Sequence, residues 1–366
     1  MAHRRQRSLD RYTYLDLLRG LSAFCVLIVH YRWFYAERTG DYADVTGRMP
    51  FNGVLWPIYD YGGLAVQTFW LLSGVVFSLI YGAPGDRIGA WDFFVKRVAR
   101  LYPLHLVTLL VMAGLQAWSL TSLGRWTVYG NNNVPHFVLQ LFMASNWLKA
   151  FGDSFNAPIW SVSVEIIIYV AFFTFAKQTS RHWTRYLAVA ALFGLALKLI
   201  HSPVLQCGVL FFLGGAVARL RVQCAQSGSA GFLAAAGGGL ALSGTAAAAL
   251  FGSGNGYAGL QAITYGALPC LVLLALHCDL ALPSIPMRLR WIGDITYATY
   301  LLHMPILIAA KIGMDQHEVP RDWLDSAWVL VAYLASVIVL SLAVHRWFES
   351  PAQTWLNRTL GVARRR

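Results

Sequence analysis

The sequence is divided by a series of apolar runs, each about 20 residues long, and this spacing limits the possible folds more than any other feature. A helix of that length spans the hydrocarbon core of a bilayer, where helices satisfy every backbone amide within one segment. With 57% of its 366 residues hydrophobic and only 13% charged, the chain has too much apolar surface for a soluble protein. The sequence therefore predicts an all-α integral membrane protein.

Ten segments have the length and apolar content of membrane-spanning helices. They are residues 14–34, 62–81, 101–120, 158–176, 183–200, 203–218, 231–251, 257–278, 295–313 and 327–348. A shorter apolar segment, residues 134–148, is predicted to be interfacial or re-entrant. The predicted organisation is an N-terminal tail (1–13), one polytopic membrane domain (14–348) built as a bundle of about ten helices, and a short basic tail (349–366).

The net charge of +12 has two simple explanations, nucleic-acid binding or the bias of membrane loops. The basic residues are dispersed between the apolar segments, which favours the second and predicts no nucleic-acid partner. With ten spans, 20 of the 29 Lys and Arg residues fall on the side of the N-terminus and 8 on the other side. Because cytoplasmic loops carry the excess of Lys and Arg, both termini are predicted to be cytoplasmic.

The first predicted span carries two ionisable residues, Arg19 and His30. Eleven residues at 100° each end about 20° beyond three full turns, so both side chains share one helix face, with a rise of about 16 Å between them. Charged groups inside a bilayer are costly and usually face a cavity or each other. A lone histidine of this kind is often a structural residue, but an imidazole beside an arginine on one face also suits a catalytic role.

Arg97 and Arg100 precede the third span and share a helix face at its predicted cytoplasmic end. They are either ordinary positively charged anchors or a clamp for phosphate, since the guanidinium fork matches phosphate oxygens.

Glu165 lies about two turns into the fourth predicted span, with Ser161 one turn earlier and Tyr169 one turn later. A carboxyl group at this depth must be protonated, paired or in a wet cavity. Both a functional role and a buried structural pair remain open from the sequence.

The ninth predicted span brings Tyr300 and His303 to one face, just before Pro305. His303 is therefore either a site residue or a partner for a backbone group that the proline leaves free. The histidines and the five cysteines show no metal-ligand spacing, so no metal is predicted.

Six segments in order resemble the bacterial acyltransferase-3 family of integral membrane acyltransferases. They are LDLLRGLSAFCVLIVH, GGLAVQTFWLLSGVVFS, FFVKRVARLYP, APIWSVSVEIIIY, YATYLLHMP and RWFESP, spread over about 340 residues. Arg19 and His30 match the family's first-helix pair, Arg97 and Arg100 its RxxR pair, and Glu165 its buried glutamate. Relatives often carry a further hydrolase-like domain after the last span, and this sequence is expected to be a form without it.

The resemblance implies transfer of an acyl group, usually acetyl from acetyl-coenzyme A, to a hydroxyl of a cell-surface or exported glycan in the bacterial inner membrane. His30 is expected to act as general base or to carry the acetyl group in a relay. Arg19, Arg97 and Arg100 are expected to bind the coenzyme phosphates, and Glu165 to orient His30 or an arginine. Trp160, Ser161, Tyr300 and His303 are expected to contact substrate. The alternatives are a proton-coupled transporter of a glycan or lipid-linked precursor, and an acyltransferase that modifies a macrolide or another small acceptor.

Overall fold

The computed structural model describes residues 12–36, 43–81, 89–147, 151–177, 182–223, 229–281 and 289–361. These residues form helices and turns with no β-strand, which confirms the all-α fold class. The α-helices are α2 (Thr13–His30), α3 (Asn52–Tyr61), α4 (Leu64–Tyr81), α5 (Ala90–Leu123), α6 (Val134–Leu141), α7 (Trp160–Lys177), α8 (Trp183–Leu199), α9 (Pro203–Gln223), α10 (Ser229–Gly252), α11 (Gly256–Ala262), α12 (Leu268–Ala281), α13 (Arg290–Asp294), α14 (Thr296–Gln316), α15 (Ala327–Val344) and α16 (Ser350–Thr359).

Nine helical stretches among the described residues are long and apolar enough to cross a membrane. The expected fifth span forms α8, whose 17 residues make it about 26 Å long, slightly shorter than the hydrocarbon core. Two helices also exceed their predicted lengths. α5 has 34 residues and begins well before residue 101, and α15 continues through the π-helical segment His345–Glu349 into α16. The tail expected from residue 349 is thus helical as far as Thr359.

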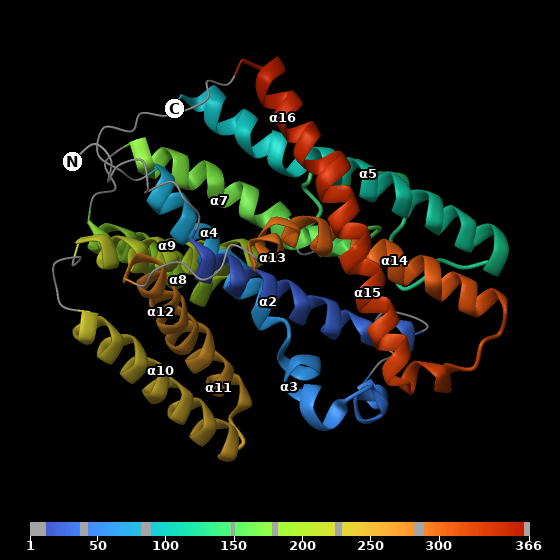
Figure 1. Ribbon diagram of the computed structural model, residues 1–366, viewed down its shortest axis with the longest axis horizontal. Coiled ribbons are helices and arrows are strands. Elements are labelled where there is room, and N and C mark those ends of the chain that lie inside the picture. The colour runs from blue at the N-terminus through green and yellow to red at the C-terminus, as the bar shows by residue number, and fades with distance from the viewer. Residues whose placement is uncertain are drawn as a thin grey trace.

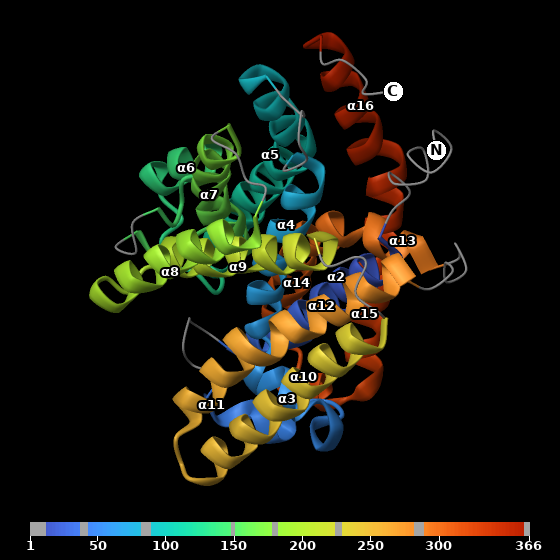
Figure 2. The same ribbon diagram turned by 90° about the vertical axis from the view of Figure 1, so that its left-hand side faces the viewer.

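The helices form one bundle in which α2, α4, α7, α9 and α14 occupy the middle (Figure 1). α14 is the most enclosed of the spans, whereas α10 is exposed along most of its length. Figure 2 shows α10, α11 and α12 grouped beside α8 and α9. Many large apolar side chains lie on the outer surface, among them Leu199 and Trp328, each 80% exposed. Such a surface suits lipid and would be unfavourable in water.

Two glycines allow α4 and α9 to pack closely. A Cβ atom added to Gly74 would lie 1.7 Å from the carbonyl oxygen of Phe211, and one added to Gly214 would lie 2.0 Å from that of Leu71. Small residues at helix crossings are typical of membrane bundles because they let two backbones approach each other. This contact fixes α4 against α9, and α4 in turn supplies one wall of the site described below.

Helix ends that the sequence assigns to one side of the membrane do lie together. Asp279 at the end of α12 accepts hydrogen bonds from the backbone N–H groups of Tyr14 (2.8 Å) and Leu15 (3.1 Å) at the start of α2. Arg219 near the end of α9 donates to the hydroxyl of Ser78 near the end of α4 at 3.0 Å. These contacts agree with the alternating order of the predicted spans. Which side is cytoplasmic stays a prediction from the charge distribution.

We expect a cysteine at Val54, which is 79% exposed in α3, to react with a membrane-impermeant maleimide in intact cells. A cysteine at the exposed Thr359, in α16, should react only after the membrane is permeabilised. The unmodified chain, with its own five cysteines, is the control for background labelling. Labelling of the Thr359 variant alone in intact cells would reverse the predicted sidedness.

Candidate functional site

A cavity of about 130 Å³ lies in the middle of the bundle, between α2, α4, α5, α7 and α14. Six of the residues singled out from the sequence line it: Arg19, Arg97, Arg100, Ser161, Glu165 and Tyr300. They come from four helices that are far apart in the sequence. The structure therefore brings together most of the predicted site, and we call this space the arginine cavity.

The three arginines differ in how far their charges are compensated. Arg19 forms an ion pair with Asp16 at 3.5 Å, and Arg100 forms one with Glu349 at 3.0 Å. Arg97 forms no ion pair with a described carboxylate. It donates to the hydroxyl of Tyr81 at 3.2 Å, lies 4.8 Å above the ring of Phe77, and leaves its buried Nε without a partner. A cation held in this way is available to bind an anionic ligand.

Glu165 lies in the same cavity and is 7% exposed. The hydroxyl-bearing side chains of Ser73 and Tyr169 line the cavity with it, and its Oε1 has no hydrogen-bond partner among the described residues. Of the two roles expected for this residue, the geometry favours the one among the arginines, since Arg19, Arg97 and Arg100 line the same cavity and His30 does not.

His30 ends α2, and one of its ring nitrogens is held by the backbone of the same helix. Nδ1 lies 2.7 Å from the carbonyl oxygen of Val26. Since a carbonyl only accepts, Nδ1 must carry the proton, and the lone pair of the neutral ring is then on Nε2. This is the tautomer that a general base or a nucleophile needs, with its orientation already fixed.

His303 lies against His30, with 4.9 Å between the ring centroids. It is fully buried, and neither of its ring nitrogens has a hydrogen-bond partner in the described part of the chain. The backbone group that Pro305 leaves free is the carbonyl of Leu301, which instead accepts from Nδ2 of Asn156 at 3.1 Å. Asn156, and not His303, therefore satisfies the carbonyl that Pro305 leaves free.

Tyr300 connects the histidine pair to the arginine cavity. It lines the cavity, and its ring centroid lies 6.0 Å from that of His303. Its hydroxyl is fixed by Ser161 Oγ at 2.7 Å and by the carbonyl of Pro158 at 2.9 Å. Trp160 is not among the residues that line the cavity. It packs edge to face on Trp70, with 5.7 Å between the ring centroids. Substrate contact by these residues stays a prediction; Ser161 and Tyr300 line the arginine cavity and Trp160 does not.

Glu349 is a site residue whose role was missed from the sequence, although it lies in one of the family-like segments. It is 3% exposed, ends the π-helical segment His345–Glu349, and pairs with Arg100 and with Nδ1 of His345, each at 3.0 Å. The signal that could have revealed it is an acidic residue directly after an apolar span, opposite an unpaired arginine on another helix. A pairing across 249 residues has no local pattern, so only the fold shows it.

We expect Glu349→Gln to raise the KM for the acyl donor about five- to thirtyfold with little change in kcat. The amide keeps the shape of the side chain but no longer holds Arg100 in position by charge, which costs roughly 1–2 kcal/mol in binding. Steady-state kinetics with purified protein would measure it. Asp322→Asn, which removes an exposed ion pair with Arg48, is the matched control and should change neither constant. An equal loss in kcat and thermal stability, with an unchanged KM, would make Glu349 a purely structural residue.

The polar groups of the segment between α5 and α7 are largely used within that segment. Asn132 bonds the backbone of Tyr129 and Phe155, and Gln140 donates to the carbonyl of Ser154. Of the acidic residues between α2 and α4, Glu37 and Asp41 lie outside the described residues. Among the described residues no group of three His, Cys, Asp or Glu side chains is placed to hold a metal ion.

Comparison with known proteins finds a match between residues 12–346 and the model of a family described as an acyltransferase domain. Over 396 aligned positions the chain is 28% identical to Nodulation protein 10 of Rhizobium leguminosarum bv. viciae, which covers 96% of this chain and 95% of that protein. No solved structure matches.

Two further relatives match over shorter stretches. The chain is 31% identical over 166 residues to the acyltransferase MdmB of Streptomyces mycarofaciens, covering 45% of this chain and 38% of that protein. It is 27% identical over 220 residues to YrhL of Bacillus subtilis (strain 168), whose assigned name is that of a peptidoglycan O-acetyltransferase. The second match covers 54% of this chain and 30% of YrhL, so the matched part is about a third of each of these two relatives.

Proposed function

The chain belongs to the acyltransferase family whose model spans residues 12–346, and on that premise we propose that it transfers an acetyl group from acetyl-coenzyme A to a hydroxyl of a glycan at the bacterial inner membrane. The observation that carries the proposal is the arrangement of charge along α2. Arg19 lies in the arginine cavity, while His30, about 16 Å further along the same helix, meets His303. The family match favours an enzyme over a transporter.

The arginine cavity supports an acyl donor that carries phosphates. Arg19 and Arg100 are a third and a quarter exposed, so the cavity opens toward the helix ends where the sequence predicts the cytoplasm. A space of about 130 Å³ admits a narrow chain but no nucleotide. The pantetheine arm would therefore enter the cavity while the phosphates stay with the arginines, which bind such groups as forks.

The histidine pair supports activation of the acceptor. Nε2 of His30 would take the proton of the acceptor hydroxyl as the oxygen attacks the thioester carbonyl. The new C–O bond forms, the C–S bond breaks, and the coenzyme leaves as a thiolate that receives a proton from His30 or water. The same Nε2 lone pair also suits a relay in which His30 is acetylated first. Direct transfer needs acceptor and donor together, whereas the relay does not.

Acceptor identity is proposed from the relatives. YrhL carries the name of a peptidoglycan O-acetyltransferase, which favours a saccharide hydroxyl, and MdmB is an acyltransferase matched over less than half of either chain. The test is to incubate purified, membrane-reconstituted protein with radiolabelled acetyl-coenzyme A and cell-envelope saccharides. Label in the saccharide fraction and release of free coenzyme are expected. If free coenzyme is released and the label appears in a small-molecule acceptor but not in saccharide, the protein is still an acyltransferase, but its acceptor is not a glycan.

A further inference from the structure

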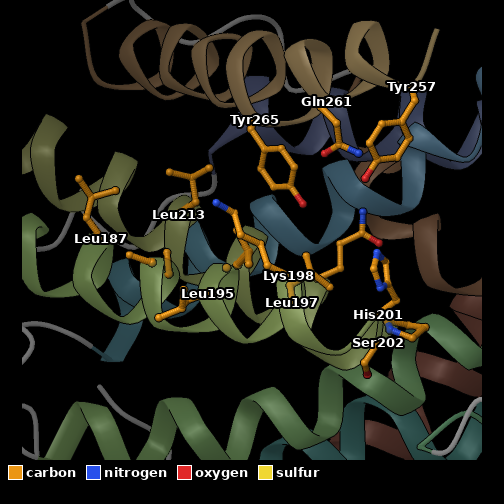
Figure 3. Close-up of a pocket in the computed structure, with 16 residues that line it drawn as sticks. Leu187, Leu195, Leu197, Lys198, His201, Ser202, Leu213, Tyr257, Gln261 and Tyr265 are labelled. Carbon is orange, nitrogen blue, oxygen red and sulfur yellow. The ribbon is translucent and has the colours of Figure 1, made fainter. Parts of the chain in front are cut away.

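A second, larger cavity lies outside the arginine cavity. It is a groove of about 1020 Å³ between α8 and α9 on one side and α11 with the π-helical segment Ile263–Ala267 on the other. Figure 3 shows the labelled side chains, with Leu187, Leu195 and Leu213 toward one end and His201, Gln261 and Tyr257 toward the other. The groove therefore has an apolar half and a polar half.

The separation of the two halves follows from the helix that forms one wall. Leu187 and Lys198 are eleven residues apart on α8, which corresponds to about 16 Å along its axis. That distance is about half the thickness of the hydrocarbon core. The apolar half thus lies at the depth of lipid chains, and the polar half lies toward the membrane surface at the end of α8.

The polar half carries positive charge without a compensating carboxylate. None of the 16 residues that line the groove is acidic. Lys198 and His201 are both exposed, and neither forms an ion pair with a described residue. The side-chain amides of Gln206 and Gln261 and the hydroxyl of Tyr257 add neutral hydrogen-bond donors. A lysine in a groove that has no acidic lining residue favours an anionic group, and the neutral donors can add hydrogen bonds to it.

One wall of the groove departs from regular α-helix at this place. The π-helical segment Ile263–Ala267 interrupts the run from α11 to α12, and it carries Tyr265, whose side chain lines the groove. Such one-turn π segments widen a helix locally and are often found at functional sites. On the other side, α9 separates the groove from the arginine cavity, since Phe211 of α9 packs on Phe77 and Tyr169, which line that cavity.

We propose that this groove binds one anionic phospholipid of the surrounding bilayer, with an acyl chain along Leu187, Val209 and Leu213 and the phosphate group at Lys198 and His201. The site is separate from the proposed transfer chemistry and does not depend on it.

The experiment places the purified full chain in nanodiscs of neutral phosphatidylcholine that contain a small fraction of phosphatidylglycerol with a photoreactive acyl chain. After illumination, labelled peptides are mapped by mass spectrometry. We expect labels on the groove residues of α8 and α9, and much weaker labelling there by photoreactive phosphatidylcholine. Equal labelling of the groove by both lipids would overturn the proposal, because the groove would then not distinguish an anionic headgroup from a neutral one.

Two variants test the two halves of the groove. Lys198→Gln combined with His201→Gln should reduce groove labelling by phosphatidylglycerol about tenfold, the cost of losing one charge-assisted contact. Arg358→Gln combined with His182→Gln likewise replaces one basic residue and one histidine, at exposed positions elsewhere, and should leave groove labelling unchanged. Gly194→Leu should block the apolar half, since a Cβ there meets only Val209, at 3.9 Å, and the added side chain extends into the slot.

Size-exclusion profiles show whether each variant is folded before labelling. Undiminished groove labelling in both the charge variant and the Gly194→Leu variant would overturn the site. A competition series, in which unlabelled lipids displace the photoreactive one, is the last measurement. If a polyisoprenyl phosphate displaces the photoreactive lipid at lower concentration than unlabelled phosphatidylglycerol does, the occupant is an isoprenoid carrier and the phospholipid proposal fails.

Discussion

His30→Gln is expected to abolish nearly all acyl transfer while the protein still inserts and accumulates normally. Removing a general base typically lowers the rate about 10²- to 10⁴-fold, which corresponds to roughly 3–5 kcal/mol at the barrier. Glutamine can still donate to the carbonyl of Val26, as Nδ1 of His30 does, but it has no group that takes a proton at neutral pH. The measurement is the initial rate of acetyl transfer, normalised to folded protein.

His105→Gln is the matched control, because His105 lies inside the bundle and, like His30, has one ring nitrogen held by a backbone carbonyl, 2.7 Å from Nε2 to the carbonyl of Gln140. It should keep most of its activity. His30→Ala should be as inactive as His30→Gln. If His30→Gln transfers acetyl at close to the normal rate and His30→Ala fails to accumulate, His30 is a structural residue, and Glu165 becomes the next candidate base.

Replacing Arg97 by Ala is expected to raise the KM for acetyl-coenzyme A about 10- to 100-fold. A hydrogen bond to a charged group contributes about 1.5–3 kcal/mol, and Arg97 is the arginine of the cavity with no carboxylate partner among the described residues. Arg100→Ala should have a smaller effect, since Glu349 already holds part of that charge. Lysine at position 97 should restore only part of the affinity, because a point charge lacks the guanidinium fork.

Arg358→Ala, an exposed arginine on α16, is the control and should leave the KM unchanged. The KM for the acceptor should also stay close to normal in every arginine variant, which separates binding of the acyl donor from a general loss of structure. An unchanged KM for acetyl-coenzyme A in both Arg97→Ala and Arg100→Ala would return the two residues to the role of membrane anchors.

The sequence predicted which residues belong to the candidate site better than it predicted which of them lie close together. Arg19, Arg97, Arg100 and Glu165 stood out because ionisable groups in apolar helices are costly and rarely accidental. That they share one cavity follows from three helices, α2, α5 and α7, meeting in space, which no spacing within a helix encodes. The contact between His30 and His303 likewise joins residues that are 273 positions apart. The hydrogen bond from Asn156 to the carbonyl that Pro305 leaves free also comes from a distant part of the chain, so the sequence near His303 gave no sign of it.

The fold class was predictable because hydropathy alone identifies helices in a membrane protein. The ends of the helices were less predictable. α5 begins eleven residues before its apolar run, since its first turns extend beyond the hydrocarbon and need no apolar side chains there. The same reason explains why the last helix continues past Glu349. The groove between α8 and α11 has no sequence signal, because its lining residues are ordinary surface positions on separate helices.

Because Arg19 and His30 belong to one continuous helix, the number of residues between them sets both their distance along the axis of α2 and the angle between their side chains around that axis. Inserting or deleting a single residue between them would change their spacing by only about 1.5 Å but would rotate one side chain about 100° around the axis relative to the other. The helix would remain intact and fully hydrogen-bonded, yet its two functional groups would face different neighbours. Variation in this family should therefore tolerate many apolar exchanges between the two positions and no change in their number.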